Sequence, residues 1–161
     1  MEYPIPSHLK NYLQLIGDEN DEFKITVIVK CKCGSESFRI YESNNKMIVK
    51  LICSACNKEL ILFDEGKYGW NGFVCNDDFL NREESLKVTK CSECNNDEFK
   101  IEVTITSQGK EDFINESNLQ NSHGEILNES DWVNGFEWIS ANITCSNCKN
   151  EEEHWLDCET M

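Results

Sequence analysis

The chain has 161 residues, of which 30 are acidic, 15 are basic and ten are cysteine, and its formal net charge is −15. The longest apolar stretches, such as residues 60–63, are far shorter than the roughly 20 residues of a membrane-spanning helix, so we expect no membrane segment. The excess of acid argues against direct binding to nucleic acid, because modules that bind phosphate normally carry a basic surface.

The N-terminal residues predict one short helix and no secretory signal. Residues 1–10 contain neither a basic start nor a long apolar stretch, so we expect a cytoplasmic protein. Residues 7–17 begin with a Ser suited to an N-cap, carry apolar residues at 9, 12, 13 and 16, and end at Gly17. This pattern is typical of a helix.

The rest of the chain predicts strands rather than helices. Alternating apolar residues mark strands over 23–30, 38–41, 47–52 and 60–63 in the first half. The corresponding segments of the second half are 86–90, 99–106, 138–144 and 154–156. Each half is therefore predicted to run as strand, cysteine turn, hairpin, cysteine turn and strand.

Eight of the ten cysteines form four close pairs. A tight turn with two cysteines supplies two of the four thiolates that zinc prefers, and in a reducing compartment such pairs are metal ligands before they are disulfides. The first two pairs are 19 residues apart, close to the spacing of known zinc sites, and the last two are 50 apart. The pairs are Cys31/Cys33, Cys53/Cys56, Cys91/Cys94 and Cys145/Cys148.

The two halves also resemble each other in sequence. In both, the first cysteine pair is followed by polar residues, a Phe, a basic residue and Ile, as in CKCGSESFRI (31–40) and CSECNNDEFKI (91–101). The second pairs share the pattern C-S-x-C. We therefore predict a duplication with units over 1–80 and 81–161. The second unit has an acidic insertion over about 107–135, in which we expect 107–131 to be an exposed loop.

This arrangement resembles the zinc-ribbon superfamily, in which two cysteine turns at the ends of β-hairpins hold one zinc ion. The resemblance covers roughly residues 23–65 and 86–158. It implies a small β-rich, metal-stapled fold of two tandem ribbon units and two Zn²⁺ per chain. The implied ligands are Cys31, Cys33, Cys53 and Cys56 for one ion, and Cys91, Cys94, Cys145 and Cys148 for the other. Because each unit has a small core, we expect the metal-free chain to be largely unfolded.

The predicted function is that of a non-enzymatic zinc protein with structural sites, which binds another protein. No motif of a hydrolase, phosphate-binding loop or dinucleotide site is present, and four thiolates leave zinc no open position for water. The acidic surface favours a basic protein partner. Two alternatives remain: a transcription- or nucleic-acid-associated ribbon, and a thiol or rubredoxin-like iron redox protein, since four cysteines also suit iron.

Several further residues are candidates for secondary roles. Cys75 and Cys158 lie outside the pairs and are redox thiols, a disulfide, an extra ligand pair or buried apolar residues. His154 lies between Cys148 and Cys158 and is a reserve ligand or a plain strand residue. Two similar aromatic segments either cap the core, which we expect, or form a partner surface; their rings are Trp70, Phe73, Trp132 and Phe136.

Overall fold

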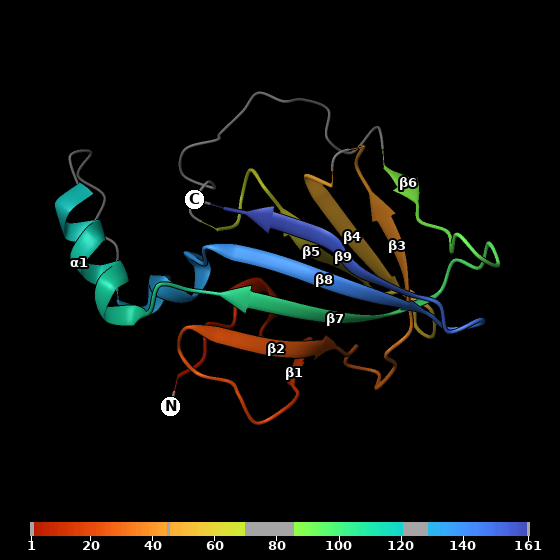
Figure 1. Cartoon of the computed structure of the whole chain (residues 1–161), viewed down its shortest axis with the longest axis horizontal. Helices are drawn as coiled ribbons and strands as arrows, with labels where there is room; N and C mark the ends of the chain where they lie inside the picture. Colours follow the sequence, from red (N-terminus) through yellow and green to blue (C-terminus); the bar gives the residue numbers. More distant parts are fainter. Residues whose placement is uncertain (1, 45, 70–85, 121–128, 161) are drawn as a thin grey trace.

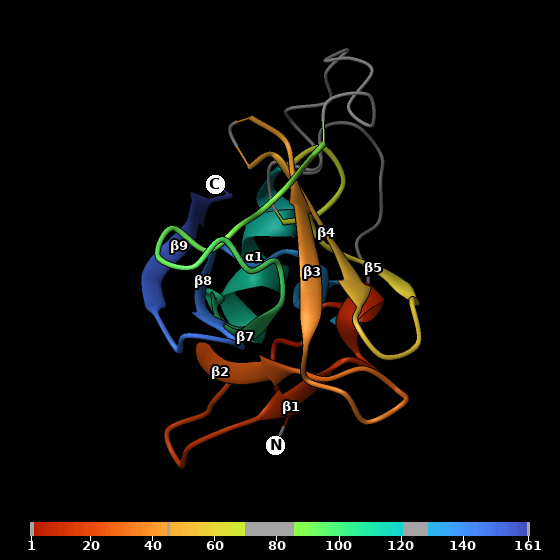
Figure 2. The same cartoon turned by 90° about the vertical axis from the view of Figure 1, so that its right-hand side faces the viewer.

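The computed structural model describes residues 2–44, 46–69, 86–120 and 129–160, and their strands form one curled antiparallel sheet of nine strands (Figures 1 and 2). The small β-rich fold predicted from the sequence is confirmed. One α-helix, α1 (Lys110–Gln120), and short 3-10 helices at Ser7–Leu9 and Glu129–Asn134 accompany the sheet. The strands are β1 (Leu13–Leu15), β2 (Lys24–Val29), β3 (Phe38–Glu42), β4 (Ile48–Cys53), β5 (Glu59–Asp64), β6 (Lys87–Val88), β7 (Phe99–Thr106), β8 (Trp138–Cys145) and β9 (Glu151–Glu159).

The prediction of an N-terminal helix over residues 7–17 is wrong. Only Ser7–Leu9 is helical, as a single 3-10 turn, and the chain then enters β1. Leu13 and Leu15 pair with Val29 and Val27 of β2, so the backbone finds its hydrogen-bond partners in another strand. Pairing with β2 outweighs the helical preference indicated by the spacing of the apolar residues, because intrinsic helix propensity is small and tertiary contacts often override it.

The prediction of an exposed loop over residues 107–131 is also wrong in part. Residues 110–120 form α1, which begins after Gly109 and carries Glu111 and Asp112 in its first turn, where acidic side chains favour a helix. Phe113 is 1% exposed and anchors the helix. Residues 121–128 lie outside the described part of the chain. The mostly polar composition of this segment obscured Phe113, an apolar residue that is buried near the start of the helix.

Strands from the two predicted halves pair with each other. The hairpin β3–β4 continues into β5, and β7–β8 continues into β9. The first strand of each half, however, lies on the hairpin of the other: β2 pairs with β7, and β6 pairs with β3. The two hairpins meet where Phe38 pairs with Phe99. The predicted boundary at residue 80 lies outside the described residues.

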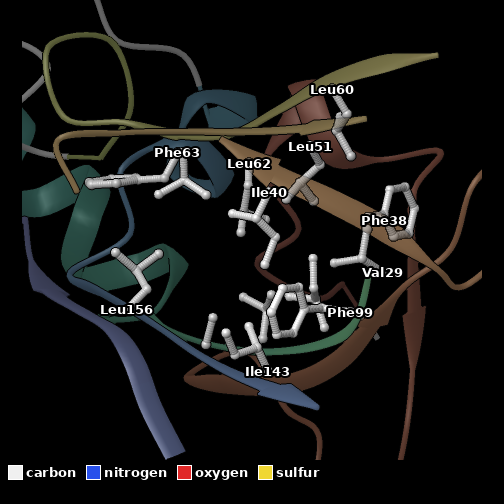
Figure 3. Packing of buried hydrophobic residues seen from close by; sticks show 14 of the residues in the cluster. Val29, Phe38, Ile40, Leu51, Leu60, Leu62, Phe63, Phe99, Ile143 and Leu156 are labelled. Carbon is white, nitrogen blue, oxygen red and sulfur yellow. The ribbon is translucent and has the colours of Figure 1, made fainter. Parts of the chain in front are cut away.

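The core fills the space that the curled sheet encloses (Figure 3). Phe38, Phe63, Phe99 and Leu156 point into it from β3, β5, β7 and β9 and are at most 2% exposed. Lys46, in the turn between β3 and β4, spans the opening of the curl, donating a hydrogen bond to the carbonyl of Trp155 in β9 and lying over its ring. The core therefore draws on both halves of the chain.

The aromatic residues near position 134 are buried. Trp132 and Phe136 are 2% and 1% exposed, and Phe136 belongs to the core cluster. Trp70 and Phe73 lie outside the described residues. No helix in the described ranges is both long and apolar enough to cross a membrane.

Candidate metal centres

The eight paired cysteines come together as two groups of four. We name Cys31, Cys33, Cys53 and Cys56 the first cysteine site, and Cys91, Cys94, Cys145 and Cys148 the second cysteine site; within each, all sulfurs lie within 4.8 Å of one another. The closest sulfurs are 3.5 to 3.6 Å apart. Around a tetrahedral metal with bonds of about 2.3 Å, sulfurs are about 3.8 Å apart, whereas a disulfide measures about 2.0 Å. Each group therefore fits one metal ion.

The four cysteine turns share one backbone design. In the three C-x-x-C turns, the first cysteine donates its N–H to the carbonyl five residues later and accepts from the N–H four residues later. In the C-x-C turn both partners come one residue earlier, so it is the same turn shortened by one residue. The partners are Lys58 and Asn57 for Cys53, Asn96 and Asn95 for Cys91, Asn150 and Lys149 for Cys145, and Ser35 and Gly34 for Cys31.

The residue directly after the second cysteine of each turn has positive φ. These residues are Gly34 at 96°, Asn57 at 60°, Asn95 at 64° and Lys149 at 65°. Gly and Asn tolerate this region best, so three of the four turns carry a suitable residue. A Gly or Asn directly after a cysteine pair is therefore a second sequence signal for this turn, in addition to the spacing of the cysteines.

Backbone amides around the turns favour the thiolate form of particular cysteines. Burial opposes ionisation of Cys53, but N–H groups of Cys56 and Ala55 point at its sulfur and lower its pKa to about 6. At Cys145 burial is likewise outweighed by the N–H groups of Cys148 and Asn147, which lower the pKa to about 6. Because metal ligands must be deprotonated, the protein environment prepares these sulfurs to bind a cation.

The two sites lie at the same end of the sheet, opposite α1 (Figure 1). Cys53, Phe38, Phe99 and Cys145 form one row across β4, β3, β7 and β8, each paired with the next. At about 4.8 Å per strand, the row places the two cysteines roughly 15 Å apart. The hydroxyl of Ser37 bridges the second-turn serines of both sites, lying 3.4 Å from each. The sites are thus joined by a short, packed connection.

Of the other predicted residues, those described lie in neither group. Cys158 is half-buried in β9, where burial and the nearby carboxylates of Glu65, Asp157 and Glu159 raise its pKa to about 11. It is therefore protonated at neutral pH and is a weak nucleophile. His154 is exposed in β9 and its backbone N–H donates to Asn142. Cys75 lies outside the described residues.

Two functional residues that the sequence reasoning did not identify support the second cysteine site. The side-chain amide of Asn147 donates to the sulfur of Cys94, and that of Asn96 donates to the sulfur of Cys145, each over 3.6 Å. The signal was an amide residue within or directly beside a cysteine turn. Such outer donors orient and stabilise metal ligands.

Comparisons of the chain with protein-family models, curated proteins and solved structures found no significant match. Identification of the sites depends on the chemistry of the donors. Four thiolates in a tetrahedron suit zinc or iron and exclude the hard cations that prefer oxygen.

Proposed function

We propose that the chain is a non-enzymatic zinc protein of the zinc-ribbon type, with one structural zinc ion in each cysteine site. The observation that carries this proposal is the gathering of two separate sets of four sulfurs within 4.8 Å. Four thiolates saturate zinc and leave no position for a substrate. The four cysteines of each site would therefore hold two cysteine turns together, and the metal would supply folding free energy rather than catalysis.

A duplicated origin of the two units is supported by their matching strand registers. In both units the first cysteine of the second turn pairs with the Phe that lies five residues after the preceding turn, as Cys53 pairs with Phe38 and Cys145 with Phe99. The first strand of each unit, β2 or β6, pairs with the hairpin of the other unit, and the two pairings have the same register. We call these two strands the exchanged strands. Ile28 and Val88, each three residues before a first cysteine, pair with Glu102 and Tyr41, each three residues after that Phe.

We further propose that the protein works by binding another protein, with a basic surface as the preferred partner. Residues 81–161 carry 18 acidic and six basic side chains, and each zinc bound by four thiolates would add two more negative charges. Such a field attracts basic proteins and repels the phosphate backbone. Association with nucleic acid is the second candidate, carried only by the resemblance to zinc ribbons.

Metal analysis of the purified protein tests the metal sites directly. We expect about two zinc per chain, falling to one in Cys53→Ser and in Cys145→Ser. Cys158→Ser is the matched control and should keep two, because Cys158 belongs to neither site. Iron in place of zinc would favour the rubredoxin-like alternative, and a chain without metal would contradict the proposal.

Affinity capture on the zinc-loaded protein, with and without nuclease, tests the partner. A basic protein that is retained after nuclease, and lost when the bait is Cys53→Ser/Cys145→Ser, would support a protein-binding module that depends on its metal sites. Retention that disappears with nuclease treatment would favour the nucleic-acid alternative.

A further inference from the structure

The two cysteine sites differ in how far their cysteine residues are exposed. In the first cysteine site the second cysteine of both turns, Cys33 and Cys56, is exposed. In the second cysteine site Cys148 is exposed, but Cys94 is partly covered. The first site therefore has two exposed cysteine residues and the second has one.

The sites differ also in the side chains that donate to sulfur. Asn147 and Asn96 donate to Cys94 and Cys145 of the second cysteine site. At the position in the first site that matches Asn147, the middle of C-S-x-C, the chain has Ala55, which is exposed. Among the described residues, no side-chain amide donates to a sulfur of the first site. Because such donors draw electron density from a metal-bound thiolate, the second site is the better protected.

The charged side chains near each site also favour higher reactivity of the first cysteine site. The turns of the first cysteine site carry two basic residues, Lys32 and Lys58, and no acidic one, whereas those of the second carry Glu93 and Lys149. Lys32 is held beside its turn, with its ammonium 5.4 Å from the centre of the Tyr12 ring. Exposed cysteines among positive side chains are typical of reactive cysteines.

We propose that the first cysteine site is a reactive metal–thiolate centre for hydrogen peroxide, and that the second cysteine site reacts more slowly under the same conditions. The proposal rests on the proposed function, since it requires metal in both sites. It gives the first site a chemical role, the release of its metal on oxidation, beyond its contribution to the fold.

The reaction is a two-electron oxidation. The thiolate of Cys33 or Cys56 attacks one peroxide oxygen, the O–O bond breaks, and hydroxide leaves with a proton as water. The sulfenic acid so formed is attacked by the neighbouring thiolate, which is Cys53 at 3.6 Å from Cys33 and Cys31 at 3.5 Å from Cys56. The S–S bond forms, a second water leaves, and the metal loses two ligands. Two thiolates are oxidised and one peroxide is reduced to two waters.

A reciprocal swap at the matched position separates reactivity from folding. The wild type, Ala55→Asn, Asn147→Ala and the double variant Ala55→Asn/Asn147→Ala are loaded with zinc, and metal content is measured before the reaction. Each protein is then treated with hydrogen peroxide in the presence of a chromogenic zinc chelator. Mass spectrometry of peptides assigns the oxidised cysteines. Both substitutions are neutral in charge and lie on the surface of a turn.

We expect the wild type to release one zinc about tenfold faster than the other, with the disulfide in the first cysteine site. Ala55→Asn should slow the fast phase, Asn147→Ala should speed the slow phase, and the double variant should bring the two rates together. Release of both metals at one rate, or oxidation of the second site first, would overturn the proposal. Metal content below two per chain before peroxide is added would instead count against the proposed function.

Discussion

The residue directly after the second cysteine of each turn adopts a left-handed conformation. It is Gly in one turn, Asn in two and Lys in one. Gly34 closes the shortened C-x-C turn with φ of 96°. A Cβ at this position would meet no atom within 4 Å. Any cost of substitution there is therefore a backbone cost and does not arise from packing.

We expect Gly34→Val to lower the free energy of unfolding by about 1–2 kcal/mol, because a β-branched residue is strained at positive φ. Gly34→Asn is the matched control and should cost less, since Asn tolerates this region. Denaturant unfolding of the zinc-loaded proteins measures both values. Equal stability of the two variants would show that the turn does not hold this conformation in solution.

His8 is a half-buried titratable side chain that belongs to neither cysteine site. Its ring stacks on Tyr68 at 3.6 Å and its Nε2 donates to the carbonyl of Leu62. Its Nδ1 is buried and has no hydrogen-bond partner among the described residues. Burial lowers the pKa of His8 from 6.5 to about 4, although the Leu62 carbonyl acts in the opposite direction. The folded state therefore holds a neutral imidazole.

This arrangement makes stability depend on pH in a defined window. Because the folded pKa lies below the unfolded one, the stabilising contribution is present above pH 6.5 and is lost as the pH falls towards 4, by about 3 kcal/mol at most. His8→Phe keeps the stack on Tyr68 but cannot bind the proton. We expect wild type to lose more stability than His8→Phe between pH 6.5 and 4 in denaturant unfolding.

Loss of metal in acid affects both proteins equally, so it cancels from this comparison. Parallel stability curves for the two proteins would show that His8 is exposed to solvent in the folded state.

At the scale of elements, the crossing of β3 and β7 connects the two cysteine sites. Phe38 and Phe99 pair at this crossing, and each is paired on its other side with a cysteine of one site, Cys53 or Cys145. Both rings are at most 2% exposed. Each ring is therefore paired directly with one cysteine and lies two strands away from the other.

We expect Phe99→Ala to destabilise the protein by about 3–5 kcal/mol, the usual cost of removing a buried ring. It should also weaken metal binding at both sites, measured by chelator competition. Phe99→Leu, which keeps most of the volume, should cost less, and Phe23→Ala should cost little because Phe23 is 50% exposed. Weakening confined to the second cysteine site would contradict transmission through the row of paired residues.

The strands and the grouping of cysteines could be predicted from the sequence, because both depend on local patterns. The alternating apolar residues in 23–30 and 99–106 predicted strands, and these segments contain β2 and β7. The spacing of the cysteines predicted the two groups of four that the structure brings together. The predictions were wrong where contacts with distant segments determine the local structure. Leu13 and Leu15 form β1 because β2 offers backbone partners, and Phe113 of α1 is buried in a segment whose composition is mostly polar. The pairing of β2 with β7 joins residues 74 to 82 positions apart, and that of β6 with β3 joins residues 45 to 47 positions apart, which no local pattern encodes.

At the scale of the whole molecule, each half supplies a strand that pairs with the hairpin of the other half, β2 with β7 and β6 with β3. Buried residues of both halves pack into one cluster, including Val27 and Ile40 from the first and Val103 and Ile143 from the second. A half on its own would leave its exchanged strand without its main partner. The predicted units over 1–80 and 81–161 are therefore complementary rather than self-sufficient in their hydrogen bonding.

We expect the separate fragments 1–80 and 81–161 to remain largely unfolded even with zinc, because the apolar faces of β2 and β7 would be exposed to water. Mixing the fragments in equal amounts with zinc should restore native far-ultraviolet circular dichroism and a dispersed NMR spectrum. A mixture in which 1–80 carries Val27→Asp is the matched control and should not recover, since Val27 is buried where β2 pairs with β7. If each fragment instead folds alone around its own zinc, the two units are independent ribbons and the exchanged strands contribute little to their stability.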